Sequence, residues 1–231
     1  MAFRYEDQQE RSFFRKLLSP AFMVHKVRRV VHNVYWDWKF GGSCAGAVAP
    51  LAHMGANGTA SLDYEQLALL FTPSRVPIGP SDVLVDIGCG KGRVLNFWLR
   101  AGHRNRMIGI ELNEKVALPT RDRLRPYPNV TVISGDALLH IPVDGTIFYL
   151  YHTFQRHVME RFKNRLVELF ARRGQVTLVY CNCHFLNVFE DDPHWSIDLL
   201  NWDKSLVFPS AIIRMKDRLD EETISGAAQT P

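Results

Sequence analysis

Short β-branched runs alternate with helical stretches from Val83 onward, and this alternation constrains the fold more than any other feature of the sequence. Apolar residues at helical spacing fill the intervals near 92–101, 114–125 and 154–173. Strands that alternate with helices are typical of βαβ units, so the sequence predicts an α/β fold with a doubly wound, mostly parallel sheet. The strand runs are VLVDI (83–87), MIGIEL (107–112), VTVIS (130–134), TIFYLY (146–151) and QVTLVYC (175–181).

The segment before this alternation predicts helices and a loop. Residues 8–36 carry apolar residues at helical spacing and predict one or two helices, broken near Ser19-Pro20 because proline disrupts a helix interior. Clustered Gly and Ala in residues 41–60 predict a flexible loop. A short amphipathic helix is expected near residues 62–71.

The end of the chain predicts one more strand and a tail. Residues 206–215 predict a late strand, in which Pro209 favours an edge position or a bulge. The sequence therefore divides into a basic helical arm (1–40), a Gly/Ala-rich loop with a short helix able to form a lid (41–80), an α/β core (81–219) and a disordered tail (220–231).

Composition and charge exclude several classes of protein. The chain is 46% hydrophobic and 23% charged, as ordinary globular proteins are, and its four cysteines are too few for a disulfide framework. No secretory signal is recognised at the start and no apolar run approaches about 18 residues, so a cytoplasmic location is expected. Residues 1–40 hold eight basic and four acidic residues, and the rest holds twenty of each. A neutral body argues against nucleic acid as a partner.

A glycine-rich turn follows the first predicted strand. Asp86 ends the strand, and Gly88, Gly90 and Gly92 follow at every second position before a helix begins. Glycines here allow a sharp turn and a close approach to a ligand at the carboxyl end of the strand, where open α/β sheets bind their ligands. The spacing is not the G-x-G-x-x-G fingerprint of dinucleotide binding.

Polar residues stand at the ends of the next strands. Glu111 ends the second strand about 20 residues beyond the last glycine, where a carboxylate can accept hydrogen bonds from ribose hydroxyls. Asp136 follows the third strand, where it can accept from an adenine amino group. The fourth strand ends with Tyr149, Tyr151, His152 and Phe154, which are expected to face the same crevice.

With the motifs DIGCGKG, IGIELN, SGDAL and FYLYHTF in this order, residues 40–215 resemble the class I S-adenosylmethionine-dependent methyltransferases, in particular small bacterial members whose substrates are mostly unassigned. The resemblance implies a Rossmann-like fold with S-adenosylmethionine as cofactor, no metal, and a small molecule or a protein side chain as acceptor. It assigns the ribose to Glu111 and the adenine to Asp136 with Ala137, and places Tyr64 over the methyl-transfer site. The cofactor-binding set it implies is Asp86, Gly88, Cys89, Gly90, Gly92, Glu111, Leu112, Asp136, Ala137 and Tyr149, and the catalytic set is His152, Tyr151 and Tyr64.

The sequence departs from those relatives at two strand ends. Their fourth-strand motif reads Leu-Phe-Asn-Pro-Phe and their fifth strand ends Tyr-x-Asn-Pro, whereas this chain has His152-Thr153 and Asn182-Cys183. His152 is either a general base, because histidine titrates near neutrality, or a simple helix cap. One of the two strand tyrosines could be a core residue.

Other residues also have two possible roles. Cys181, Cys183 and His184 are interpreted as structural rather than as metal ligands, since the separated pairs of a zinc site are missing. Lys91 and Arg93 either orient the glycine turn or meet the cofactor carboxylate.

Two rival functions stay open on the sequence alone. One is a cofactor-binding module without catalysis, peripheral to a membrane or a partner, and the other is an NAD-dependent oxidoreductase, which the glycine spacing disfavours. The arm at residues 1–40 is interpreted as a lid over the acceptor pocket, with weak contact to an anionic membrane surface as the alternative.

Overall fold

In a computed structural model of the chain, residues 20–46, 51–58, 61–172, 176–200, 203 and 205–216 are described. The predicted tail at 220–231 and the first 19 residues of the predicted arm lie outside these ranges.

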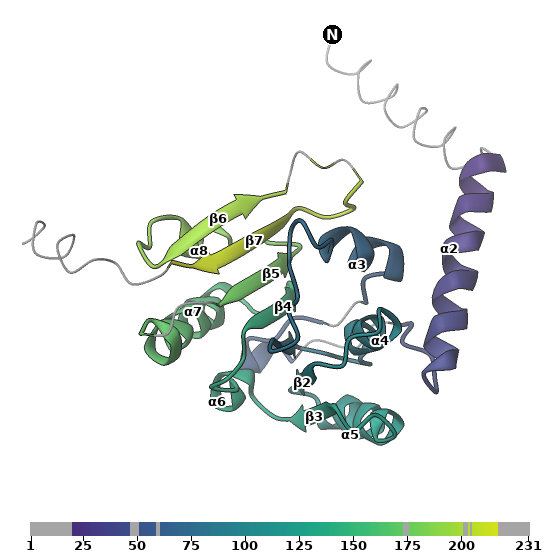
Figure 1. The fold of residues 1–231 in the computed structure, drawn as a ribbon, viewed down its shortest axis with the longest axis horizontal. Helices are drawn as coiled ribbons and strands as arrows, with labels where there is room; N and C mark the ends of the chain where they lie inside the picture. The colour runs from purple at the N-terminus through teal and green to yellow at the C-terminus, as the bar shows by residue number, and fades with distance from the viewer. Residues whose placement is uncertain are drawn as a thin grey trace, which may run out of the picture.

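A seven-stranded sheet in the order β3-β2-β1-β4-β5-β7-β6 forms the centre of the molecule (Figure 1). The pairs among β1 to β5 are parallel, and β7 pairs antiparallel with both β5 and β6. The doubly wound, mostly parallel sheet predicted from the alternation of strands and helices is therefore confirmed. The strands are β1 Val83–Ile87, β2 Arg106–Glu111, β3 Val130–Ser134, β4 Ile147–Tyr151, β5 Thr177–Cys181, β6 Trp195–Leu199 and β7 Ser210–Met215.

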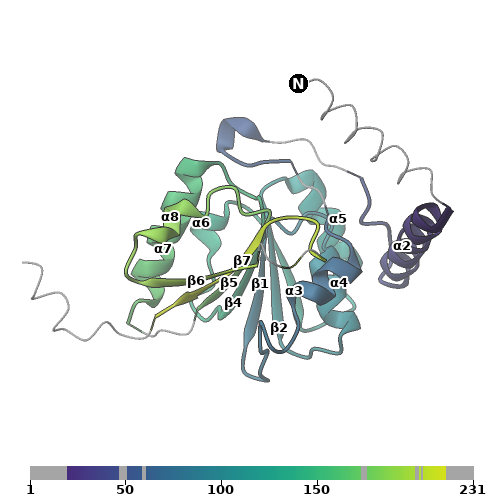
Figure 2. The ribbon, with the colours of Figure 1, turned by 90° about the horizontal axis from the view of Figure 1, so that it is seen from above.

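Helices cover both faces of the sheet (Figure 2). On one face lie α6, α7 and α8, and on the other lie α3, α4 and α5, with α2 outermost beside α4. The helices are α2 Pro20–Lys39, α3 Tyr64–Leu70, α4 Arg93–Arg100, α5 Glu114–Leu124, α6 Ala137–His140, α7 Arg156–Phe170 and α8 Asn187–Glu190. A 3-10 turn spans Ala52–Met54.

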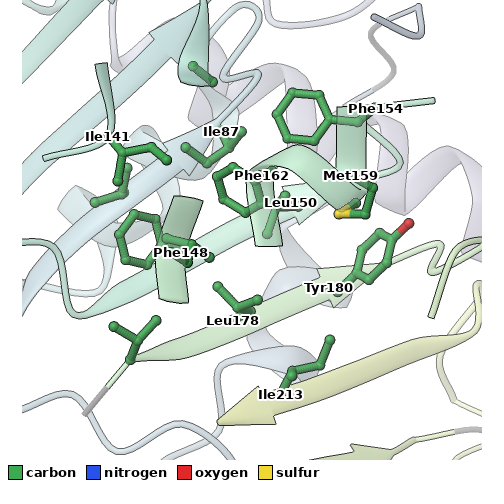
Figure 3. Close-up of a cluster of buried hydrophobic side chains, with 14 of the residues drawn as sticks. Ile87, Ile141, Phe148, Leu150, Phe154, Met159, Phe162, Leu178, Tyr180 and Ile213 are labelled. Carbon is green, nitrogen blue, oxygen red and sulfur yellow. The ribbon is translucent and has the colours of Figure 1, made fainter. Parts of the chain in front are cut away.

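Apolar side chains of each strand divide between two cores because successive residues point to opposite faces. The larger core is closed by α7, whose stripe contributes Phe162, Leu166 and Phe170, each at most 2% exposed. Figure 3 shows Phe162 and Met159 of α7 above Leu150 of β4, with Tyr180 and Ile213 from the neighbouring strands. This packing supports one face of the sheet and fixes the positions of the strand ends.

The last two strands differ from what the sequence predicts. Pro209 lies just before β7, and β7 is an interior strand between β5 and β6, so the predicted edge position or bulge is wrong. Proline is tolerated because it precedes the ladder and costs it no hydrogen bond. Strand β6 was not predicted, since only one face of it is covered and its sequence, WSIDL, mixes polar with apolar residues.

Candidate active-site crevice

The glycine-rich turn after β1 folds back on the end of β2. Gly88, Gly90 and Gly92 have φ angles of 74°, 52° and 73°, a conformation that residues with a Cβ atom rarely adopt. The amide of Gly88 donates to the carbonyl oxygen of Ile110 at 2.8 Å. A Cβ atom at Gly88 would lie 2.5 Å from Cγ2 of Thr153, so the close approach of the β1 and β4 ends requires glycine.

Glu111, the last residue of β2, is 5% exposed and held by the turn. Its Oε2 accepts from the amide of Gly90 at 2.9 Å, and its Oε1 accepts from the amide of Asn113 at 2.8 Å. Burial raises the pKa of Glu111 above its ordinary value, and the backbone donors offset part of this rise. Each oxygen keeps acceptor capacity for a further donor, so the carboxyl group is a positioned but incompletely used acceptor.

Asp86 lies beneath the turn with one oxygen unsatisfied. It is 2% exposed, and its Oδ2 has no hydrogen-bond partner among the described residues. Burial, and then the nearby carboxyl group of Glu111, raise its pKa well above the ordinary value for Asp. An unsatisfied buried acceptor of this kind is costly and calls for a functional explanation.

A crevice opens at the carboxyl ends of β1, β2, β3 and β4. Its place at the strand ends is where α/β sheets bind ligands. Asp136 lines it while also capping α6, since its Oδ1 accepts from the amide of Leu138 at 2.9 Å. The predicted site residues that line the crevice are Gly88, Glu111, Leu112, Asp136, Ala137 and Tyr151.

Residues 51–58 close one side of the crevice. The side-chain amide of Asn57 donates to the carbonyl oxygens of His152 and Phe154 at 2.9 and 3.0 Å, and its backbone amide donates to that of Thr153 at 3.0 Å. Ala56 pairs with Phe154 in an isolated antiparallel bridge. Asn57 thus anchors residues 51–58 of the predicted loop to the end of β4, and the flexibility of the loop stays a prediction.

The ends of β4 and β5 both turn through left-handed backbone. His152 and Asn182 have φ angles of 42° and 53°, which costs energy for residues with a Cβ atom. The His152 ring lies 4.3 Å from that of His184, and it is not on the crevice lining. Burial, and then the neighbouring His184, lower the pKa of His152 below its ordinary value. The structure thus does not bring the predicted base to the crevice.

The structure places Tyr64 away from the crevice. The side chain is fully buried, and its hydroxyl donates to Oδ1 of Asp37 at 2.9 Å, in the layer between α2 and α4. The prediction that Tyr64 lies over the transfer site is therefore wrong, since α3 turns it inward to satisfy a carboxylate on α2. Tyr149 is also buried in the sheet, beside Asp86 in the register of β1 and β4.

A buried polar network supports the back of the glycine turn. Arg93 is 6% exposed and donates to Asp37 through Nε at 3.1 Å and Nη2 at 2.6 Å. The carbonyl oxygen of Lys91 accepts from Nη2 of Arg123 at 2.6 Å and from the thiol of Cys44 at 3.1 Å. Of the two roles considered for Arg93, these contacts favour orienting the turn. Cys89, Gly90 and Gly92 are part of the turn itself and do not line the crevice.

Several further residues line the crevice that were not predicted from the sequence. Thr153 fills the space beside Gly88, and its hydroxyl donates to the carbonyl oxygen of Ile87 at 2.9 Å. Val158 and Arg161 reach the crevice from α7. The departure at position 153 was a usable signal, whereas nothing in the helical stripe distinguished these α7 residues. Across the described residues, no group of three or more His, Cys, Asp or Glu is placed to hold a metal ion.

Comparisons with known proteins agree with this geometry. Residues 84–176 match the profile of the methyltransferase domain family. A search of curated proteins found no match.

Solved structures with this fold include enzymes of different substrates. An RNA methyltransferase from Salinibacter ruber, in complex with S-adenosyl-L-homocysteine, is 17% identical and superposes with a TM-score of 0.52 over 71% of this chain and 97% of its own. The 23S rRNA methyltransferase ErmE is 15% identical, with a TM-score of 0.54 over 73% of this chain and 75% of its own. The mitomycin 7-O-methyltransferase MmcR is 17% identical, with a TM-score of 0.52 over 66% of this chain and 53% of its own. At these identities the likeness concerns the fold.

Proposed function

Because this chain is a class I S-adenosylmethionine-dependent methyltransferase, we propose that its crevice holds the cofactor and presents the methyl group to a small molecule or a protein side chain. The observation that carries the proposal is the set of incompletely used carboxyl groups around the glycine turn. Glu111 and Asp136 line the crevice, and Asp86 lies buried behind it with an unpartnered oxygen.

The residues present fit S-adenosylmethionine. Its ribose offers two hydroxyl donors, and Glu111 has acceptor capacity left on both oxygens after its two backbone contacts. Its adenine offers an amino group, for which Asp136 is the nearby acceptor at the third strand end. Its methionine part carries an ammonium group and a sulfonium charge, which carboxyl groups at this edge attract.

The chain's part in the reaction is alignment and exclusion of water. S-adenosylmethionine supplies a methyl group already activated by the positive sulfur. Gly88 permits close approach of a ligand to the backbone, and Thr153 beside it fixes the end of β4. Burial raises the pKa of Tyr151 to about 12, so its hydroxyl stays protonated and can donate a hydrogen bond to an acceptor. Holding the two reactants in line is the main source of rate acceleration available to such a site.

A lid role is proposed for residues 51–58. Asn57 fastens the segment to the end of β4, and Met54, Ala56 and Gly58 form one wall of the crevice. This part of the predicted lid segment at 41–80 would exclude water from the bound acceptor. The α/β core at 81–219 would then bind the cofactor.

The side chains that line the crevice indicate the chemical type of the acceptor. Apolar side chains of Met54, Phe154 and Val158 stand beside the single guanidinium of Arg161, a combination that suits a partly apolar acceptor with a polar or anionic group. The balanced charge outside the arm supports an acceptor other than nucleic acid. All four cysteines are free thiols, which supports a reducing, cytoplasmic location.

Calorimetric titration tests cofactor binding. We expect the pure protein to bind S-adenosylmethionine and not NAD, which separates the methyltransferase from the oxidoreductase alternative. The matched control for a Glu111→Ala variant is Glu168→Ala, whose side chain is 62% exposed on α7 and should leave binding unchanged. Binding of NAD alone, or of neither compound, would overturn the proposal.

Label transfer tests the acceptor. Cell extract fractions of small molecules, protein and RNA are incubated with enzyme and methyl-labelled cofactor. Label in the small-molecule or protein fraction is the expected result. Label in RNA alone would overturn the acceptor class while leaving the enzyme class intact, and binding without transfer to any fraction would favour a cofactor-binding module without catalysis.

A further inference from the structure

Helix α2 turns its apolar side away from the rest of the molecule. In both views of the fold it lies at the outside of the α4 layer (Figures 1 and 2). Large apolar side chains at spacings of three and four residues stand on its outer side: Met23, Val24, Val27, Val30, Val31, Val34, Tyr35 and Trp38, each 48 to 80% exposed. An exposed apolar stripe of this length marks an interaction surface.

The inner side of α2 is mostly polar, the reverse of an ordinary surface helix. Asp37 is 1% exposed and bonded to Arg93, Arg29 pairs with Asp63, and Asn33 accepts from the amide of Tyr64 at 3.2 Å. These directed contacts fix the rotation of the helix about its axis. The apolar stripe cannot turn inward without breaking the buried Arg93–Asp37 ion pair, so it stays on the outside of the domain.

The charges beside the stripe are positive. Lys26 borders one side of it, while Arg28 and Lys39 border the other; all three are exposed, and Arg28 also pairs with Glu65 of α3 at 3.5 Å. The acidic residue within α2, Asp37, is buried and paired. The sequence just before α2 continues the pattern, with Arg11, Arg15 and Lys16 among apolar residues. A broad apolar stripe with cationic borders suits the headgroup boundary of an anionic bilayer.

A second copy of the chain fits the stripe less well. Pairing two such helices would bring the cations at their borders together with no exposed carboxylate within α2 to oppose them. The same repulsion acts against the basic residues at 11–16 if those residues covered the stripe. Trp38, 80% exposed, and Tyr35 are amphipathic rings suited to the interface between lipid and water.

We propose that the outer side of α2 is a docking surface for an anionic lipid bilayer, on which the enzyme lies peripherally. Within the described ranges, no helix combines the length and apolarity needed to cross a bilayer. At about 1.5 Å per residue the 20 residues of α2 extend about 30 Å along the lipid surface. Docking there leaves the crevice, at the carboxyl ends of the strands, outside the contact. Docking of α2 on lipid depends neither on the identity of the acceptor nor on methyl transfer.

Vesicle sedimentation tests the proposal with the full chain. The probes are vesicles of phosphatidylcholine alone and vesicles in which a third of the lipid is phosphatidylglycerol. We expect the wild-type protein to sediment with the anionic vesicles at least tenfold more strongly than with the neutral ones. Added salt should weaken this binding, because the cationic borders contribute through a screened attraction.

Two matched variants place the contact on α2. Val31→Asp puts a charge in the stripe at a position that is 61% exposed, so folding is spared, and should lower the partition to anionic vesicles at least tenfold. Val143→Asp makes the same change at a position that is 57% exposed outside α2 and should bind as the wild type does.

Three results would overturn the proposal. The first is failure of the wild-type protein to sediment with anionic vesicles at low salt. Such a failure would mean that something other than lipid, such as a second copy or the chain's own first residues, covers the stripe. The second is equal binding by the wild type and Val31→Asp. The third is a dimer, detected by sedimentation velocity, that Val31→Asp dissociates.

Discussion

Removing the carboxylate of Asp37 should destabilise the whole domain, although the residue lies in the arm and far along the sequence from its partners. Its oxygens accept from Nε and Nη2 of Arg93 at 3.1 and 2.6 Å, from the hydroxyl of Tyr64 at 2.9 Å and from the amide of Cys44 at 3.0 Å. Asp37→Ala leaves all these donors buried without an acceptor and leaves the Arg93 charge uncompensated.

The magnitude follows from the burial of the pair. The side chains of Arg93 and Asp37 are 7% and 1% exposed, and breaking a buried pair from one side costs about 3 to 5 kcal/mol. For a chain of this size about 1 kcal/mol moves the melting temperature by about 2 to 4 °C, so a fall of about 6 to 20 °C is expected.

Thermal and urea unfolding followed by circular dichroism measure the change. Arg28→Ala is the matched control, because Arg28 also joins α2 to the core through Glu65, at 3.5 Å, but is 71% exposed. An exposed pair contributes about 0 to 1 kcal/mol, so this variant should unfold near the wild type.

A double-mutant cycle separates the pair from its surroundings. Arg93→Met combined with Asp37→Ala should cost less than the sum of the single variants, with a coupling of about 1 to 3 kcal/mol. A loss below about 1 kcal/mol for Asp37→Ala, or additive single effects, would refute the view that α2 is an integral part of the domain.

Three further predictions concern the crevice. Glu111→Ala should weaken S-adenosylmethionine binding by about 1 to 3 kcal/mol in calorimetry through lost charged hydrogen bonds, and unchanged affinity would contradict the ribose assignment. Since burial holds the pKa of Glu111 above its ordinary value, the affinity of the wild type for S-adenosylmethionine should rise with pH through that raised pKa as the carboxylate forms. Over the same pH range the ligand-free wild type should lose stability relative to a Glu111→Gln variant, because the folded state holds this proton more tightly than the unfolded chain. Parallel pH profiles of the two proteins would refute this. Gly88→Ala should abolish cofactor binding because its Cβ would lie 2.5 Å from Thr153, whereas Gly102→Ala, with a φ of 84° and open space around it, should cost only about 1 to 2 kcal/mol of stability and no affinity; equal effects would contradict the close approach.

The role of His152 is open to a direct test as well. His152→Asn should keep kcat within about threefold, because Asn tolerates left-handed backbone and the imidazole lies off the crevice. A fall of about a hundredfold or more, of the size general-base catalysis provides, would restore His152 as the base.

Local patterns were sufficient where a residue's role depends on its place along a strand or turn. The alternation from Val83 predicted the parallel sheet, because strand and helix periods are properties of the chain itself. Glu111 and Asp136 could be predicted at the crevice since carboxyl ends of parallel strands share one edge of the sheet. Side chains that reach the crevice from other segments, such as Asn57 and Arg161, gave no local signal.

Local sequence was sufficient to predict the fold class, the glycine turn and the carboxyl groups around it, because each depends on residues that are neighbours along the chain. The tertiary structure was needed to show that Tyr64 points at Asp37 and not at the crevice, that the His152 ring lies tilted against that of His184, and that the apolar side of α2 faces outward. For Tyr64 and α2 the decision lies with partners distant in sequence, whose charge or hydrogen-bonding capacity must be satisfied once water is excluded.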